Sequence, residues 1–326
     1  MISQSRVPTM AVICMAVWVG SFTLAPLSSA KSAGNTRQPV FAAVIHDANA
    51  DHLVVGRLGG AATRIFTAGS GDWLRDIAVS PVGNQVAFID TLSNDEGQLA
   101  VINTDGSGVR VLTHAAHAWY EHPVWSADGH TVFYSLVYTP ADPTRSNYPR
   151  VWRVPADASA PPTRIQGGSY ASPDSARPSG RWLALSSAKP DSGYGRCAIM
   201  RIAGTHRRNV GPDNCSDPIW RPGTSLLAIS RVVHDSYSAG PTVQIWMLSV
   251  KTSHYHPVSH TQSASTAGQA FPLAWSKDGS HLYFEHTNGQ HLHVYRIRPD
   301  GTGKVDVTPA IPQQRTTAIA VQPAFR

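Results

Sequence analysis

The chain has 326 residues, enough for one large domain, and no break in composition divides it into two. Charged residues make up only 15% of it and hydrophobic residues 42%, while 26 Gly and 24 Pro are spread along it, which favours many short strands over long helices. The net charge of +6 includes no run of four or more Lys and Arg, so the composition argues against a nucleic-acid-binding protein.

Residues 1–30 have the pattern of a secretory signal peptide. Arg6 precedes an apolar run that ends near Pro26, and the small residues Ser28, Ser29 and Ala30 follow it. We therefore expect cleavage after Ala30, a short linker over residues 31–37, and a periplasmic or secreted protein with no stable membrane span after cleavage. An uncleaved membrane anchor is the alternative, because the apolar run is at the lower length limit for spanning a bilayer.

Three apolar or alternating segments follow the linker and predict strands at residues 39–44, 52–57 and 62–67. A tight turn then recurs five times, each time followed by two free positions and an apolar strand. These turns lie at residues 80–83, 126–129, 177–180, 220–223 and 276–279. Their glycines are 46, 51, 43 and 56 residues apart, the length of four short strands with their turns, which is typical of one propeller blade.

The two ends of the sequence complete the count of blades. Residues 318–323 read as an inner strand and its turn with no further strands after it, and the three N-terminal strands supply what that blade lacks. The sequence therefore predicts an all-β protein, a six-bladed β-propeller over residues 38–326 whose last blade is closed by both chain termini. Closure of this kind pairs strand edges that would otherwise promote aggregation.

Cys197 and Cys215 are the two cysteines that would remain after signal cleavage. An oxidising compartment makes a disulfide between them a reasonable expectation. Two buried, unpaired thiols are the alternative.

The repeated turn resembles a known family. Asp128-Gly129, Asp278-Gly279 and Asp300-Gly301-Thr302-Gly303 resemble the turns of the TolB-like, WD40-like (PD40) β-propeller repeats. The resemblance covers about residues 38–326, without the N-terminal domain of TolB. It implies a propeller that serves as a binding platform, with partners docking at one mouth of the central channel.

The loops that lead into the inner strands should meet at that mouth. Aromatic and Arg side chains there would supply most of the affinity, and acids would select a basic or hydroxyl-bearing ligand. The candidate ligand-binding residues are Arg75, Trp119, Tyr120, Glu121, His122 and Asp217. A structural role is the alternative for the acids Asp76, Glu121 and Asp217, which would then accept neighbouring backbone N–H groups.

A metal site is a second hypothesis, because His114, His117 and His122 lie close together before one inner strand. It would make the protein a metal-dependent lyase or hydrolase. No G-x-S-x-G or H-E-x-x-H motif accompanies these histidines, so we expect no metal, no cofactor and no catalysis. The preferred prediction is a monomeric envelope protein that recognises a protein, peptide or glycan.

Overall fold

The chain divides into two units, Met1–Arg37 and Gln38–Arg326. The computed structural model describes residues 38–323 of the second unit, except 93–96, 116–117, 139–147, 190–191, 237–239, 260–267, 288–290 and 313–315. The predicted signal peptide and linker lie outside the described residues. All regular structure in the described part is β-strand.

One four-stranded sheet joins the two ends of the described chain. Its order is β24-β1-β2-β3, with Ala42 of β1 opposite Ala320 of β24. The strands are β1 (Val40–His46), β2 (Asp51–Arg57), β3 (Ala62–Thr67) and β24 (Thr316–Val321).

Three further four-stranded sheets follow in chain order, each built from consecutive antiparallel strands. The first holds β4 (Trp73–Val79), β5 (Gln85–Thr91), β6 (Gly97–Asn103) and β7 (Arg110–His114). The second holds β8 (Ala118–Trp125), β9 (Thr131–Tyr138), β10 (Arg150–Pro155) and β11 (Thr163–Ser169). The third holds β12 (Ala171–Ala176), β13 (Trp182–Lys189), β14 (Ser192–Arg201) and β15 (Arg208–Asp213).

The remaining strands form one eight-stranded sheet made of two antiparallel runs. The runs are joined by a single parallel pair, Val243 of β18 with Gln269 of β20. The first run is β16 (Cys215–Trp220), β17 (Leu226–Ser236), β18 (Gly240–Ser249) and β19 (Tyr255–Pro257). The second is β20 (Gln269–Trp275), β21 (Leu282–Thr287), β22 (Leu292–Ile297) and β23 (Val305–Asp306).

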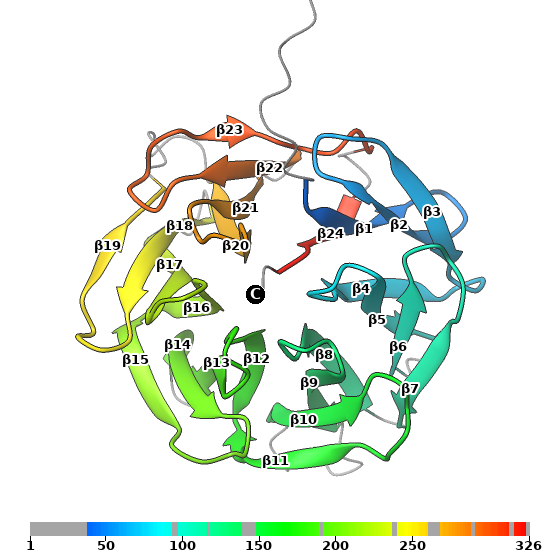
Figure 1. Cartoon of the computed structure of the whole chain (residues 1–326), viewed down its shortest axis with the longest axis horizontal. Coiled ribbons are helices and arrows are strands. Elements are labelled where there is room, and N and C mark those ends of the chain that lie inside the picture. Colours follow the sequence, from blue (N-terminus) through cyan, green and yellow to red (C-terminus); the bar gives the residue numbers. More distant parts are fainter. Residues whose placement is uncertain are drawn as a thin grey trace, which may run out of the picture. The chain divides into compact units, whose positions relative to one another are not determined.

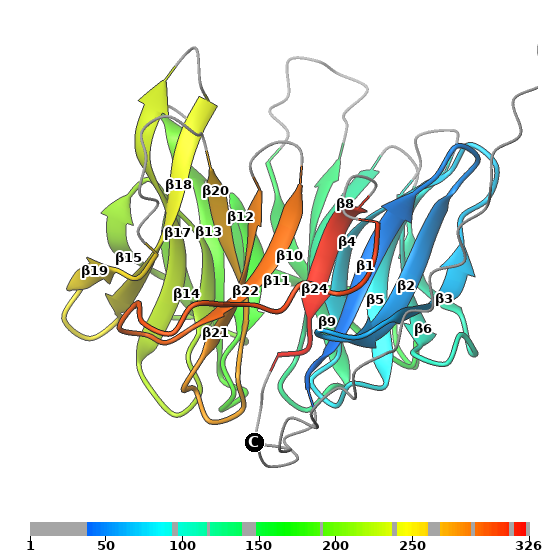
Figure 2. The same cartoon turned by 90° about the horizontal axis from the view of Figure 1, so that it is seen from above.

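The sheets are arranged around a central axis as in a β-propeller. The inner strands β4, β8, β12, β16, β20 and β24 lie nearest the centre (Figure 1). They run along the axis, and β24 ends at the face opposite the long β17–β18 hairpin (Figure 2). We call the face where the inner strands begin the mouth face, and the opposite face, where their tight turns lie, the turn face.

The repeated turns of the sequence are the hairpins that follow the inner strands. In one of them Gly129 has φ 73°, a left-handed conformation that glycine adopts without steric cost. Asp128 stabilises this turn, because its Oδ1 accepts the Ser126 hydroxyl at 2.6 Å and the His130 N–H at 3.0 Å.

Tryptophans at the ends of inner strands connect neighbouring inner strands. The Trp125 indole N–H donates to the carbonyl of Ala78 at 3.0 Å, and Trp275 donates likewise to Ile219 at 3.4 Å. Arg177 lies over the ring of Trp220, 4.9 Å from its centroid. Apolar side chains fill the space between sheets, so the core forms interlayers rather than one central mass.

Candidate functional site

The inner strands enclose a cavity of about 190 Å³ on the channel axis. All six inner strands contribute to its wall. The lining residues are Asp76, Ile77, His122, Pro123, Val124, Pro173, Asp174, Asp217, Ile219, Pro272, Leu273, Ile319 and Ala320. A second cavity of about 130 Å³ shares part of this wall and continues into an apolar surround that includes Val79, Trp125 and Val321.

β-bulges bring polar side chains to this wall. The pairing of β4, β8 and β16 with the next strand shifts register around Asp76, His122 and Asp217. These residues have positive φ of 43°, 51° and 51°, which is uncommon outside glycine. A bulge bends a strand and redirects one side chain, and strain of this kind concentrates at functional sites. These three bulges lie at matching positions of three inner strands. We therefore take the part of the channel wall that they form as a candidate site.

The bulges are also connected to each other and to neighbouring sheets. Oδ2 of Asp76 accepts the backbone N–H of His122 at 3.4 Å, so the structural role considered for this acid is present. The N–H of Asp217 donates to the hydroxyl of Ser186 at 3.0 Å, and its Oδ2 accepts the Ser216 hydroxyl at 2.8 Å.

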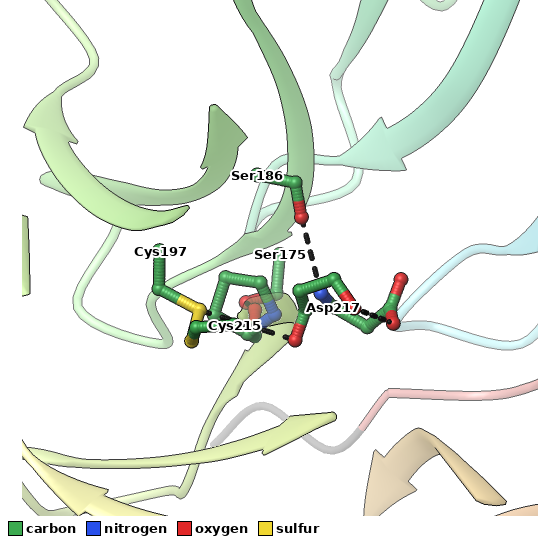
Figure 3. Close-up of a disulfide and its surroundings, with 7 residues drawn as sticks. Ser175, Ser186, Cys197, Cys215 and Asp217 are labelled. Carbon is green, nitrogen blue, oxygen red and sulfur yellow. Dashed lines mark hydrogen bonds between the residues drawn. A yellow bond between two sulfur atoms is a disulfide. The ribbon is translucent and has the colours of Figure 1, made fainter. Parts of the chain in front are cut away.

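A disulfide lies beside the bulge of β16. Cys197 of β14 is bonded to Cys215, with their Cα atoms 5.3 Å apart, so it links two neighbouring sheets (Figure 3). The hydroxyl of Ser175 on β12 donates to the carbonyl of Pro218 at 2.7 Å and accepts the N–H of Trp220 at 3.2 Å. The strand that carries Asp217 is therefore fixed by one covalent bond and by side chains from β12 and β13.

Arg75 and Trp119 form a pair at the mouth face. The Arg75 guanidinium lies 5.0 Å from the centroid of the Trp119 ring and donates to the carbonyl of Tyr120 at 3.0 Å. Trp119 remains 36% exposed. Arg75 therefore orients the indole, and Trp119 offers the free surface.

The expectation that Tyr120 belongs to the binding face is wrong. Its side chain is 1% exposed and packs on Tyr134, with ring centroids 5.6 Å apart. Burial raises the pKa of the Tyr120 hydroxyl, which is 3.3 Å from the hydroxyl of Thr113. Successive side chains of a strand point to opposite sides, so Trp119 faces solvent while Tyr120 faces the core.

The other predicted residues lie on β8 and β16. Glu121 is half-buried, and its carbonyl accepts the Ser135 hydroxyl at 3.3 Å. His122 and Asp217 line the cavity, whereas Arg75, Trp119 and Glu121 do not. The structure thus divides the predicted set into an exposed rim at Trp119 and a channel wall at His122 and Asp217.

The histidine metal hypothesis falls partly outside the described residues. Residue 117 and the side chain of His114 belong to that part, and only His122 is placed on the channel wall. Within the ranges that the structure describes, no three His, Cys, Asp or Glu side chains are grouped as metal ligands would be.

Sequence reasoning missed Asp174, Ser186 and Glu285. Burial, and then the charge of Asp217, raise the pKa of Asp174 well above its usual value, although hydrogen bonds with Ser186 oppose this. Burial also raises the pKa of Glu285 on β21 to about 7, and the charge of Asp217 contributes. Aligning the turns could have found this level, because Asp76, His122 and Pro173 each lie four residues before a turn and Asp217 lies three residues before one.

Exposed aromatic side chains stand where three successive inner strands begin. Trp73 is 52% exposed, Trp119 36% and Tyr170 38%. Tyr148 packs on Tyr170 with ring centroids 4.0 Å apart. An arc of aromatic rings beside a polar channel is a common composition for a recognition surface.

Comparisons with known proteins establish the fold and no more. The structure is similar to TolB from Acinetobacter baumannii, with a TM-score of 0.63, 13% identity, and coverage of 87% of this chain and 67% of that one. It is similar to a chain of a nidogen/laminin complex, at TM-score 0.60, 15% identity, and coverage of 88% and 99%. It is also similar to a puromycin hydrolase, at TM-score 0.58, 14% identity, and coverage of 83% and 45%. No family model and no curated protein matches the sequence. The chain therefore has a TolB-like β-propeller fold, which is shared by binding proteins and enzymes.

Proposed function

We propose that this chain is an exported, six-bladed propeller that binds a protein or peptide at the mouth face of its channel. One observation carries the proposal: strained bulges turn Asp76, His122 and Asp217 onto a cavity wall to which all six inner strands contribute. Register shifts occur at the same level of β12 and β20 as well, but Asp76, His122 and Asp217 combine the shift with a positive φ, and backbone strain of this kind is concentrated at functional sites.

The count of six blades treats the eight-stranded sheet as two blades. Each of its two runs has the antiparallel order of the four-stranded sheets, and one parallel residue pair joins them. A single pair is a weak link beside the ladders within each run, so we interpret it as contact between neighbouring blades.

A protein or peptide ligand suits the chemistry of the mouth face better than a neutral glycan. The aromatic arc of Trp73, Trp119 and Tyr170 could stack on either class. The channel wall adds the carboxylates of Asp76 and Asp217, whose negative charges favour a basic group, and the buried carboxyl group of Asp174, which a basic group beside it would favour in its charged form.

Export is supported by the sequence and by the disulfide. Residues 1–30 have the pattern of a signal peptide, and a bond such as Cys197–Cys215 persists in oxidising compartments. Within the described residues, no helix has the length and apolar character of a membrane span.

Capture of a partner from an extracytoplasmic extract tests the proposal. Trp119→Ala and His122→Ala should lose a protein that the unaltered chain retains. Val82→Ala is the matched control, because Val82 is 63% exposed but lies in a tight turn of the turn face. Equal retention by all four proteins would contradict a mouth-face site.

A further inference from the structure

We propose that Asp174 and Asp217 form a subsite for a cation, filled by the ammonium or guanidinium end of a Lys or Arg side chain of the partner. The inference rests on the proposed function, because it assigns a ligand group to the same cavity. It begins from two carboxylates on neighbouring inner strands, β12 and β16, which line one wall together.

Asp174 is an incompletely paired acid. Its Oδ2 is buried and has no hydrogen-bond donor among the described residues. The other contacts of this carboxyl group are with Ser186, whose hydroxyl also accepts the N–H of Asp217. Enclosing a carboxylate without a donor for each oxygen costs stability, and a nearby carboxylate adds repulsion.

The lining of the cavity contains no permanently charged cation that would neutralise these acids. Its described residues include three Asp and one His but no Lys or Arg. Arg75, on the same strand as Asp76, donates to the Tyr120 carbonyl and stacks on Trp119 instead. The acids therefore form a site that a cation from outside would complete.

The shape and the apolar part of the wall favour a long basic side chain over a bare metal ion. Pro173, Ile219 and Leu273 lie beside the two acids and offer apolar surface for a methylene stem. About 190 Å³ corresponds to roughly six water molecules, enough for the end of a Lys or Arg side chain. A metal site would need several converging ligands, and no such group occurs in the described ranges.

Binding of short capped peptides provides the test. The probes are acetyl-Gly-Lys-Gly-amide, its Arg counterpart, and acetyl-Gly-norleucine-Gly-amide as the uncharged isostere, each titrated by NMR against the whole mature protein. Both basic peptides should bind, and Asp174→Asn and Asp217→Asn should weaken them at least tenfold. The norleucine peptide should bind at least tenfold more weakly than the Lys peptide to the unaltered protein.

A matched control separates the local effect from general charge. Asp157→Asn removes the same charge from an exposed turn outside the cavity, and it should leave peptide affinity within twofold. Thermal unfolding of each variant shows whether it is folded. We expect Asp174→Asn to be at least as stable as the unaltered protein, because it removes repulsion; a merely structural carboxylate would make it less stable.

Three results would overturn the subsite. One is equal affinity for the Lys and norleucine peptides, and another is unchanged affinity in folded Asp174→Asn and Asp217→Asn proteins. The third is saturable binding of calcium chloride without binding of either basic peptide, which would make the acids a metal site. Partner capture that still depends on Trp119 would in each case leave the proposed function standing and remove only its cationic subsite.

Discussion

Ser186 of β13 accepts the backbone N–H of Asp217 of β16 at 3.0 Å, so a side chain of one sheet fixes the strained bulge of the next. The same serine is hydrogen-bonded to Asp174. One hydroxyl therefore sets the relative position of the two acids on the cavity wall, and its loss should affect stability and binding together.

Ser186→Ala should lower the free energy of unfolding by about 1–3 kcal/mol, because it leaves the N–H of Asp217 without its acceptor. Urea unfolding of the mature protein measures this. Ser179→Ala is the control, since Ser179 is exposed in a tight turn. A Ser186→Ala protein as stable as the Ser179→Ala protein would show that the bulge does not depend on this bond.

Removal of the disulfide should destabilise the protein by about 3 kcal/mol, the usual magnitude for a closed loop of this size. The double variant Cys197→Ala, Cys215→Ala tests this in denaturant, and small apolar replacements suit the buried positions of both cysteines. A reducing agent should lower the stability of the unaltered protein and leave the double variant unchanged. If the reducing agent lowered the stability of both the unaltered protein and the double variant, or of neither, the stabilising role of the disulfide would be refuted.

Glu285 should make stability fall as pH rises. Its pKa of about 7 in the folded protein exceeds the ordinary value of 4.5, so the fold favours the protonated form. The favourable contribution is complete below about pH 4.5 and is lost as pH rises through about 7. Glu285→Gln should therefore raise the free energy of unfolding at pH 8, by about 3 kcal/mol at most, and should change that free energy little at pH 4. Thermal midpoints of both proteins at the two pH values provide the measurement, and the opposite pH trend would contradict the assignment.

Substitution of two adjacent residues of β8 should affect different properties, stability in one case and partner binding in the other. Tyr120→Ala should lower the free energy of unfolding by about 3–5 kcal/mol, because Tyr120 is buried against Tyr134. Trp119→Ala should change stability much less and should lose the partner. Chemical denaturation and partner capture on both proteins separate the roles; a strongly destabilised Trp119→Ala protein would contradict an exposed binding position.

The mature protein should hold no stoichiometric zinc or manganese. Elemental analysis after purification without chelators or a histidine tag measures the content, and His117→Ala is the comparison. About one equivalent of metal that disappears with His117→Ala would favour the lyase or hydrolase hypothesis over the binding platform.

Much of the fold could be predicted because the repeated turns and strands depend on residues that are close together in the sequence. Asp-Gly turns such as Asp128-Gly129 and the apolar strands after them depend on near neighbours in the sequence. The pairing of β24 with β1 followed from counting incomplete repeats. Such features are determined by a few adjacent residues, so they can be predicted from the sequence alone.

The residues of the candidate site were harder to predict from the sequence, because their surroundings depend on contacts between sheets. The prediction for Tyr120 rested on its residue type alone. The alternation of side chains along β8 points Tyr120 to the buried side and its neighbour Trp119 to the exposed side. Asp174 was missed because its environment comes from Ser186 and Asp217, 12 and 43 residues away. Neither distance leaves a pattern in the sequence.

Site-specific photocrosslinking in the native cell envelope tests the central claim most directly. A photoreactive residue would replace Trp73, Trp119 or Tyr170 at the mouth face, or Val82 at the turn face. The binding-platform account predicts adducts with one partner protein from the three mouth-face positions and none from Val82. Adducts from Val82 alone, or no adduct from any mouth-face position in folded protein, would contradict it.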